Sequence, residues 1–193
     1  YSIEIERQEN GIELKIEIAS EYFANLKEIR RNLTGRTGCG LCGAESLSQA
    51  MRIPKTKISN YYFDSKNILK ALEIFSQNQI LQKKTGATHA SALCQKDGII
   101  KITREDVGRH IALDKLIGAI LKEEVTEDSF VITSSRASYE MVQKIAHLNL
   151  KLLVAISAPT GLAIRLAENL GITLIGFARE SRYTIYSHNE RII

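Results

Sequence analysis

The first 18 residues alternate between apolar and polar side chains, which is the period of a β-strand with one buried face. Asn10 and Gly11 separate two such runs, and this dipeptide favours a tight turn. We therefore expect a β-hairpin with one buried face, formed by Ile3, Ile5, Ile12, Leu14, Ile16 and Ile18. Residues 21–30 change to the period of an amphipathic helix, and from 32 to 43 neither period holds, which predicts a loop.

The middle of the chain predicts a helix, a second hairpin and a further helix. One apolar stripe at helical spacing runs over residues 66–76. Two short strands flank Asp97 and Gly98, a dipeptide typical of a type I′ turn. Thr103 and Asp106 have the spacing of a capping box, which predicts that a helix begins there and runs to about Lys122.

Three short apolar runs dominate the last third of the chain, as expected for strands that are buried on both faces. They cover residues 129–133, 151–157 and 172–178, and helical stripes over residues 141–148 and 162–170 separate them. This spacing fits βαβ units with right-handed crossovers. We expect an α/β domain in which helices cover a mixed sheet, with no linker dividing it.

Composition excludes several classes of protein. Of the 193 residues, 44% are hydrophobic and 25% are charged, and no apolar run reaches the roughly 18 residues that would cross a membrane. The net charge is only +4 and tryptophan is absent, so we expect no nucleic-acid partner. Three cysteines, an odd number, fit a reducing compartment, and we expect a cytoplasmic protein. The chain begins at Tyr1 rather than Met, so we expect that a preceding segment is missing.

Three polar segments follow the predicted strands, in the position where α/β proteins bind ligands. They read TSSRAS, SAPTG and FARESR, and the first two lead into helices whose free N–H groups favour phosphate. Arginine binds phosphate with paired donors or stacks on a base, so the segments indicate an anionic, nucleotide-like ligand. In the alternative interpretation, the hydroxyls are helix caps and the arginines are solvated. The candidate binding residues here are Ser134, Arg136, Ser157, Thr160, Arg179 and Arg182.

Residues 35–43 read GRTGCGLCG and place Cys39 and Cys42 among glycines. Glycine imposes little steric restriction, so we expect this segment to be mobile and exposed. The nearby Arg36 favours thiolate over thiol, and the thiolate is the nucleophile. Three kinds of chemistry use such a pair: zinc binding, thiol–disulfide exchange, and a carrier that accepts sulfur as a persulfide.

A zinc site would need about two further ligands, for which His89 and Cys94 are the candidates. Their odd spacing places them on opposite faces of a strand, so we expect no metal here. A zinc deaminase is excluded because its catalytic glutamate is absent and the C-x-x-C pair comes first. His89 has small neighbours that leave room for a ligand, although a structural histidine is the alternative, and we expect Cys94 in the core.

His110 lies four residues from Asp106 and from Asp114, so all three would share one face of the predicted helix. Carboxylates on both sides would orient the imidazole and favour its charged form. His110 is therefore a candidate for proton transfer or phosphate contact. The alternative is a capping Asp106 with ordinary surface pairs.

Several blocks together resemble the FdhD family of sulfur carrier proteins required for formate dehydrogenase activity. They are GRTGCGLCG, TGATHASA, EDVGRHIALDKLIG, SSRASYEMVQKIA, SAPTGLAIRLAENLGITLIGFAR and YTIYSHNERI, in family order from about Gly35 to the C-terminus. Ser135 departs from the family pattern, which usually has glycine at this position. The resemblance implies a three-layer α/β/α fold like that of cytidine deaminase, without its zinc. It divides the chain into an N-terminal β-hairpin and helix (1–34) and a sulfur-carrier domain (35–193).

The resemblance also implies a mechanism and a set of partners. Cys39 would accept persulfide sulfur from a cysteine desulfurase, with Cys42 as its companion. The sulfur would pass to the molybdenum of a bis(molybdopterin guanine dinucleotide) cofactor destined for formate dehydrogenase. This cofactor is a bound client, since we expect no permanent cofactor, and members of the family tend to form homodimers. The family's cofactor-binding stretch matches Phe177, Ala178, Arg179, Glu180, Ser181 and Arg182.

Overall fold

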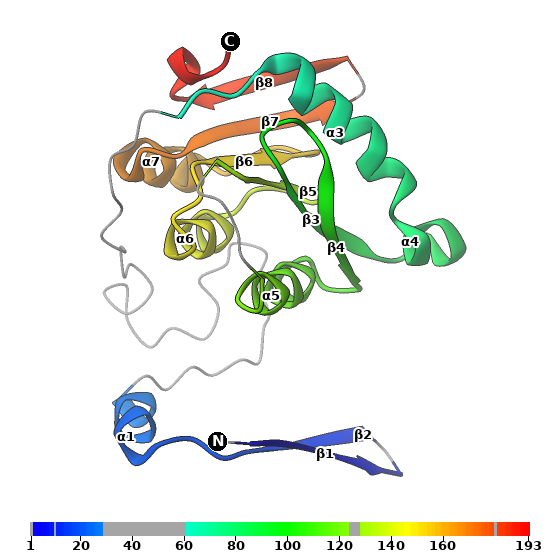
Figure 1. The fold of residues 1–193 in the computed structure, drawn as a ribbon, viewed down its shortest axis with the longest axis vertical. Helices are drawn as coiled ribbons and strands as arrows, with labels where there is room; N and C mark the ends of the chain where they lie inside the picture. Colours follow the sequence, from blue (N-terminus) through cyan, green and yellow to red (C-terminus); the bar gives the residue numbers. More distant parts are fainter. Residues whose placement is uncertain (1, 10, 29–60, 124–127, 180) are drawn as a thin grey trace. The chain divides into compact units, whose positions relative to one another are not determined.

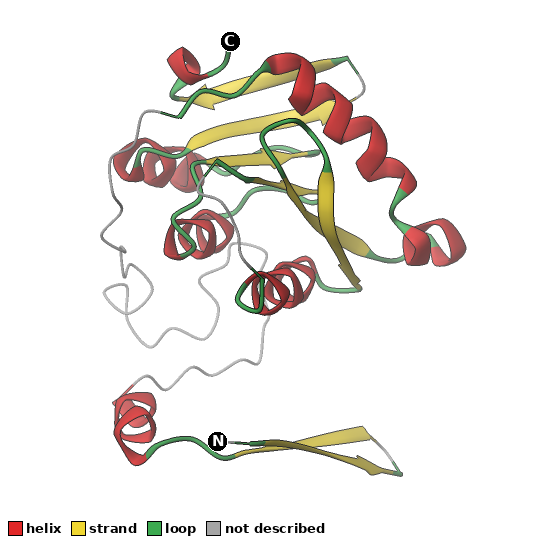
Figure 2. Cartoon of the chain, in the orientation of Figure 1, coloured by secondary structure: helices red, strands yellow, loops and turns green. Residues whose placement is uncertain are grey.

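The computed structural model describes residues 2–9, 11–28, 61–123, 128–179 and 181–193 (Figure 1). The chain falls into two compact units. One contains the N-terminal hairpin and the first helix, and the other contains residues 61–193, so we describe each by itself. Figure 2 shows the helices and strands of both units.

The N-terminal unit contains the predicted hairpin, followed by helix α1 (Ser20–Glu28). Strands β1 (Ile3–Gln8) and β2 (Gly11–Ile16) pair antiparallel, with Ile5 opposite Leu14, so the apolar side chains share one face. The expectation that this face is buried was wrong, because Ile5 is 67% exposed and the other large apolar side chains of the hairpin are exposed too. A two-stranded sheet has no second layer of its own to cover one face.

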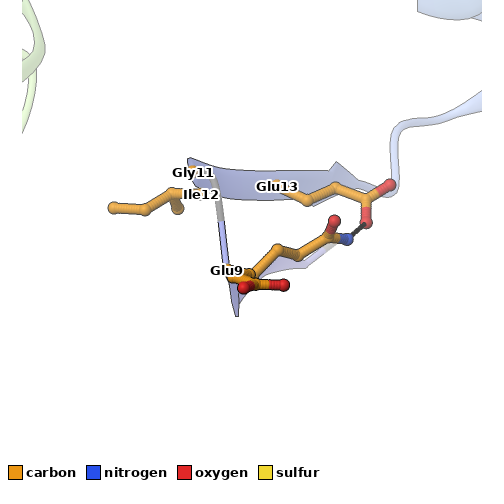
Figure 3. A pocket seen from close by; sticks show the side chains of 5 residues that line it. Glu9, Gly11, Ile12 and Glu13 are labelled. Carbon is orange, nitrogen blue, oxygen red and sulfur yellow. Dashed lines mark hydrogen bonds between the residues drawn. The ribbon is translucent and has the colours of Figure 1, made fainter.

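The turn end of this hairpin carries a surface hollow of about 610 Å³. Figure 3 shows Glu9, Gly11, Ile12 and Glu13 around it. Gln8 donates a hydrogen bond from Nε2 to the Glu13 carboxylate at 2.6 Å, which links the two strands beside the turn.

The C-terminal unit is built on a six-stranded sheet with the strand order β4-β3-β5-β6-β7-β8. The three central strands, β5 to β7, are parallel, while β3, β4 and β8 run antiparallel to their neighbours. The predicted mixed sheet is therefore confirmed. The strands are β3 (His89–Cys94), β4 (Ile100–Asp106), β5 (Phe130–Thr133), β6 (Leu152–Ala155), β7 (Thr173–Arg179) and β8 (Arg182–Ser187).

Helices cover both faces of this sheet and give the predicted three layers (Figure 1). Helix α3 (Ser65–Gln77) covers one face, where Ile68, Leu72 and Phe75 pack into a core with side chains of β3, β5, β6 and β7. Helices α5 (Arg109–Ile120), α6 (Tyr139–His147) and α7 (Gly161–Leu170) cover the other face. In the part of the chain that the structure describes, no helix is long and apolar enough to span a membrane.

The short helix α4 (Ile80–Thr85) was not predicted. The carboxylate of Glu105, on β4, accepts hydrogen bonds from the backbone N–H groups of Leu81 and Gln82 at 2.8 and 2.9 Å. These bonds satisfy N–H groups that a helix leaves unpaired at its start. The residue that caps this helix lies more than twenty positions away, so local sequence patterns give no signal for it.

The last residues of the chain close the C-terminal unit by pairing with the segment before α3. Phe63 N–H donates to the Arg191 carbonyl at 2.8 Å, and Ile193 N–H donates to the Phe63 carbonyl at 3.0 Å. Ser65 N–H donates in turn to the Ile193 carbonyl at 2.8 Å. The short helix η1 (Asn189–Arg191) precedes this pairing. The beginning of α3 is therefore held by the C-terminus.

The β3–β4 hairpin was predicted correctly, but its turn type was not. A type I′ turn needs a positive φ at both Asp97 and Gly98. Only Gly98 has one, at 82°, and its N–H bonds to the Gln95 carbonyl at 2.9 Å. The loop is therefore a β-turn over residues 95–98 that ends in a left-handed glycine, one of the common arrangements of longer hairpin loops.

The predicted capping box at Thr103 and Asp106 was also wrong. Both residues belong to β4, which pairs with β3 along its length, and α5 begins only at Arg109 with Gly108 as its N-cap. The Asp106 carboxylate accepts from Gly108 N–H at 3.0 Å and pairs with Lys115. Pairing with β3 therefore keeps these residues in a strand despite the local helix-start signal.

Candidate functional site

The three polar segments predicted at strand ends lie together at one edge of the sheet. Ser157 N–H donates to the Ser135 carbonyl at 3.3 Å, and Phe177 N–H donates to the Ser157 carbonyl at 3.2 Å. Thr160 N–H donates to the Ala137 carbonyl at 3.0 Å. These backbone bonds join the loops after β5, β6 and β7, so the predicted convergence of the three segments is confirmed.

The third segment is not an open loop but the end of the β7–β8 hairpin. Arg179 and Arg182 are direct partners across the two strands, and both side chains are exposed. Neither forms an ion pair with a carboxylate among the described residues. Like charges directly opposite each other destabilise a strand pair unless an anion offsets them. The arrangement therefore favours an anionic ligand at this hairpin end.

A pocket of about 460 Å³ opens beside these arginines. Phe177, which contributes to its lining, is 47% exposed and has a φ of 51°, in the left-handed region that aromatic residues rarely adopt. Such backbone strain is concentrated at functional sites. The lining residues are Phe177, Arg179, Arg182, Tyr183 and Thr184. Sequence analysis missed Tyr183 and Thr184, although the alternation of YTIYS directly after FARESR is the signal of a second strand.

Gly176 allows the loop after β6 to approach β7. A Cβ at this position would lie 2.7 Å from Pro159 Cδ, which is closer than atoms can pack, and 3.0 Å from the Tyr186 ring, which is a tight contact. Only glycine therefore lets Pro159 pack against the strand that carries Phe177. The loop that contains Ser157 and Thr160 is positioned in this way.

Two hydroxyls of the predicted site already have structural partners. Ser134 Oγ accepts from Ala90 N–H at 2.8 Å, and Thr160 Oγ1 caps α7 by accepting from Ala163 N–H at 3.2 Å. A hydroxyl that accepts one bond keeps its own hydrogen for donation. Ser157 is half-buried and Arg136 is exposed, and Ala178 lies in the core.

His89 lies at the start of β3, with its Nδ1 3.4 Å from Ser134 Oγ. Because Ser134 Oγ accepts from Ala90, its hydrogen is free to donate to Nδ1, and Nε2 then carries the proton of the neutral ring. Burial lowers the pKa of His89, and the nearby Arg109 guanidinium lowers it further. His89 is therefore a neutral donor at the edge of the site. Cys94, at the other end of the strand, belongs to the core on the α3 face, as predicted.

The environment of His110 differs from the prediction. Asp106 is not on the helix, and Asp114 pairs with Lys144 at 2.7 Å. The carboxylate that faces His110 Nδ1, at 3.3 Å, belongs to Glu140 on α6. The pKa of His110 is lowered rather than raised, because burial outweighs the opposing effect of Glu140.

These two lowered pKa values predict a loss of stability in mild acid. Below pH 6.5 the unfolded chain binds protons that the folded histidines resist, so the free energy of unfolding should fall as the pH drops from about 7.5 to about 5.5. Urea unfolding at several pH values measures this dependence. His110→Gln should weaken it. An equal pH dependence in the wild-type protein and in His110→Gln would contradict the prediction.

The remaining predicted site residues are only partly described. Cys39, Cys42 and Glu180 lie outside the described residues, and Ser181 is exposed beside Arg182. Within the described ranges, no group of three or more His, Cys, Asp or Glu side chains is placed to hold a metal ion. Because the cysteine pair lies outside the described residues, its geometry does not distinguish zinc binding, thiol–disulfide exchange and sulfur transfer.

The C-terminal unit is thus a three-layer α/β protein whose strand ends carry an arginine-lined pocket. The sequence profile of the FdhD/NarQ family matches residues 1–193, and the chain belongs to this family, which confirms the resemblance seen in the sequence.

Two curated relatives illustrate the similarity. The chain is 50% identical to the sulfur carrier protein FdhD of Cupriavidus necator, over 100% of this chain and 67% of that protein. It is 46% identical to the protein of the same name from Xanthomonas euvesicatoria pv. vesicatoria, over 98% of this chain and 68% of that protein. The chain therefore spans about two thirds of the length of these relatives.

A solved structure is similar as well. It is the crystal structure described as that of a formate dehydrogenase accessory protein from Desulfotalea psychrophila. The TM-score is 0.66 at 29% sequence identity, and the match covers 70% of this chain and 61% of that one.

Proposed function

We propose that this chain is a sulfur carrier that serves formate dehydrogenase. The observation that carries this proposal is its membership of the FdhD/NarQ family, with identities of 45–50% to curated relatives named sulfur carrier protein FdhD. In this proposal, a cysteine desulfurase supplies the sulfur as a persulfide. The recipient is the molybdenum of a bis(molybdopterin guanine dinucleotide) cofactor, which is the substrate of the carrier.

The sulfur-transfer step is assigned to Cys39. Its thiolate attacks the terminal sulfur of the desulfurase persulfide, forms a new S–S bond and releases the desulfurase thiolate. Attack by the Cys42 thiolate on Cys39 Sγ would release the terminal sulfur as sulfide and leave a Cys39–Cys42 disulfide. A dithiol reductant would then reduce this disulfide to the two thiols and itself become a disulfide. His89 is suited to donate a hydrogen bond from Nε2 to the anionic sulfur during its transfer. His110 is a second candidate for proton transfer.

Binding of the nucleotide part of the substrate is assigned to the β7–β8 hairpin end. Arg179 and Arg182, which form no ion pair with a carboxylate among the described residues, suit the two phosphates of a guanine dinucleotide arm, because guanidinium groups bind phosphate with paired donors. Ser134, Arg136, Ser157 and Thr160 lie at the same edge of the sheet and offer further donors. We propose a homodimer in the cytoplasm as the working form.

Replacing Arg179 with alanine should weaken the binding of guanosine diphosphate (GDP) by roughly tenfold to a hundredfold, as expected for the loss of a charge-assisted hydrogen bond. Isothermal titration with GDP measures the dissociation constant. Arg104→Ala is the matched control, since Arg104 is also exposed but lies on β4, the strand at the opposite edge of the sheet. Unchanged affinity in Arg179→Ala would remove this arginine from the site.

The carrier role is tested by incubating the whole chain with a cysteine desulfurase and labelled cysteine. Mass spectrometry should then show one added sulfur atom on the peptide that contains residues 35–43. Absence of this sulfur would overturn the proposed function. Near-stoichiometric zinc in the purified protein, lost in Cys39→Ser, would instead support a zinc-binding module.

A further inference from the structure

Several polar side chains are buried where β3 and β5 meet the starts of α5 and α6. Ala90 and Ala92 belong to the core on the α3 face, so Ser91 between them points to the opposite face, which α5, α6 and α7 cover (Figure 1). Its direct partner on β5 is Thr133, whose Oγ1 lies 3.1 Å from Ser135 Oγ. All three hydroxyl residues are buried. Hydroxyl groups therefore cluster on this interior face of the sheet, near the end of β5.

The hydroxyl of Ser138 has no hydrogen-bond partner in the part of the chain that the structure describes, although Ser138 is only 1% exposed. Ser138 is the N-cap of α6, where a serine ordinarily accepts from an N–H group of the first turn, but it forms no such bond. Ser91 Oγ and Tyr139 Oη are likewise buried, with no partner among the described residues. Polar groups that have lost their hydration occur where water, an ion or a ligand completes their bonding. The start of α6 therefore offers a bound anion one hydroxyl and the N–H groups that the helix itself leaves unpaired.

Two histidines flank the start of α6. His89 begins β3, and its Nδ1 lies 3.4 Å from Ser134 Oγ, in the loop that leads to Ser138. His110, in the first turn of α5, lies 3.3 Å from the Glu140 carboxylate in the first turn of α6. Burial lowers the pKa of both imidazoles, so each is a neutral ring with one N–H to donate. The histidines beside Ser138 are therefore hydrogen-bond donors without a charge of their own.

The charged side chains around this cluster largely compensate one another. Lys144 bonds to Glu140 at 2.8 Å and to Asp114 at 2.7 Å, and the Arg109 guanidinium adds positive charge near His89. Such surroundings are poorly suited to a doubly charged phosphate, because the free energy needed to remove water from an ion rises steeply with its charge. They suit a weakly hydrated anion with a single charge. A terminal sulfur has this character, since it spreads one charge over a large atom.

We propose that the start of α6, with Ser138 and His89, is a binding site for the negatively charged terminal sulfur of a persulfide, for which hydrosulfide is the simplest probe. Ser138 donates from its hydroxyl, His89 donates from Nε2, and the first N–H groups of α6 complete the bonding. The binding is reversible and involves no covalent step. This inference rests on the proposed function, since it assumes that the chain carries sulfur, and it adds a site for that sulfur outside the cysteine segment.

The test follows the imidazole nitrogens of the four histidines by NMR while sodium hydrosulfide is added to the whole, reduced chain without oxygen. The nitrogens of His89 should shift to saturation, whereas those of His147, at the far end of α6, should not. Sodium sulfate at equal ionic strength should produce no saturable shift of His89, because sulfate is doubly charged and strongly hydrated.

Ser138→Ala should weaken hydrosulfide binding by about tenfold, as expected for the loss of one hydrogen bond to a charged group. Its thermal unfolding temperature without hydrosulfide should stay the same or rise, because the substitution removes a buried polar group that has no partner. A hydroxyl with a purely structural role would show the opposite pattern.

Ser187→Ala is the matched control. Ser187 is a buried serine of β8, but its hydroxyl has two partners, since it accepts from Leu174 N–H at 2.9 Å and donates to the Ile172 carbonyl at 2.8 Å. Its replacement should lower the unfolding temperature and leave the affinity for hydrosulfide unchanged.

The outcomes separate this inference from the function on which it rests. Unchanged hydrosulfide affinity in Ser138→Ala overturns the site, and so does a wild-type chain whose His89 nitrogens do not respond. A lower unfolding temperature in Ser138→Ala would assign its hydroxyl to the fold instead, and equal affinity for sulfate would contradict selection for sulfur. If any of these results is obtained while a cysteine desulfurase still loads sulfur onto residues 35–43, the inference fails and the proposed function stands. Absence of that loading overturns the proposed function itself.

Discussion

Replacement of Cys39 with alanine is expected to abolish the transfer of sulfur from a cysteine desulfurase while the protein remains folded. A nucleophile that forms the covalent intermediate has no substitute in the transfer step, so the loss should be complete rather than partial. Cys39→Ala exchanges one small side chain for another, so we expect the substitution to leave folding intact.

The measurement is the fraction of protein that carries labelled sulfur after incubation with the desulfurase. Cys94 serves as an internal control, because it is fully buried and burial raises the pKa of its thiol well above the usual range. Its peptide should gain no sulfur in any variant. Cys42→Ala should still be loaded, since in the proposed mechanism Cys42 acts after loading. If Cys39→Ala were still fully loaded with sulfur, the persulfide would have to be assigned to another residue.

The substitution Gly98→Ala is expected to lower the free energy of unfolding by about 3 kcal/mol. A non-glycine residue in the left-handed region destabilises the folded state by roughly 1–3 kcal/mol. An added side-chain atom that clashes with its neighbours destabilises it by a similar amount. Both costs apply here, because Gly98 has a φ of 82° and an added Cβ would lie 2.4 Å from the Asn67 carbonyl oxygen on α3. The contact joins the β3–β4 turn to the helix that covers the core.

Gly86→Ala provides the matched control for this effect. Gly86 has a similar φ of 66°, but no atom lies within 4 Å of the added Cβ. Its cost should be limited to the backbone term of about 1 kcal/mol. Urea unfolding of both variants measures the difference. Equal destabilisation would show that the contact with Asn67 contributes nothing.

The central part of the fold could be predicted from the sequence because its signals are local. The apolar runs around Val131, Leu153 and Ile175 form parallel strands buried on both faces, and continuous hydrophobicity is the pattern of such strands. The helices between them have apolar stripes facing the sheet. The convergence of the strand-end loops followed from the parallel order, since carboxyl ends of parallel strands meet at one edge.

The errors occurred where distant residues decide the local structure. Thr103 and Asp106 look like a helix start, but pairing with β3 holds them in a strand. The partner of His110 is Glu140 on another helix, and burial, which the sequence does not show, sets the direction of its pKa shift. The hydrogen bond between Ser65 and Tyr183 could not be predicted for the same reason, because the two residues lie 118 positions apart.

The pairing of Phe63 and Ser65 with Ile193 links residues 191–193 to the start of α3. Ser65 in turn forms a hydrogen bond with Tyr183 on β8, which contributes to the lining of the arginine pocket. Substitutions that break this backbone pairing should therefore disturb α3 and β8 together.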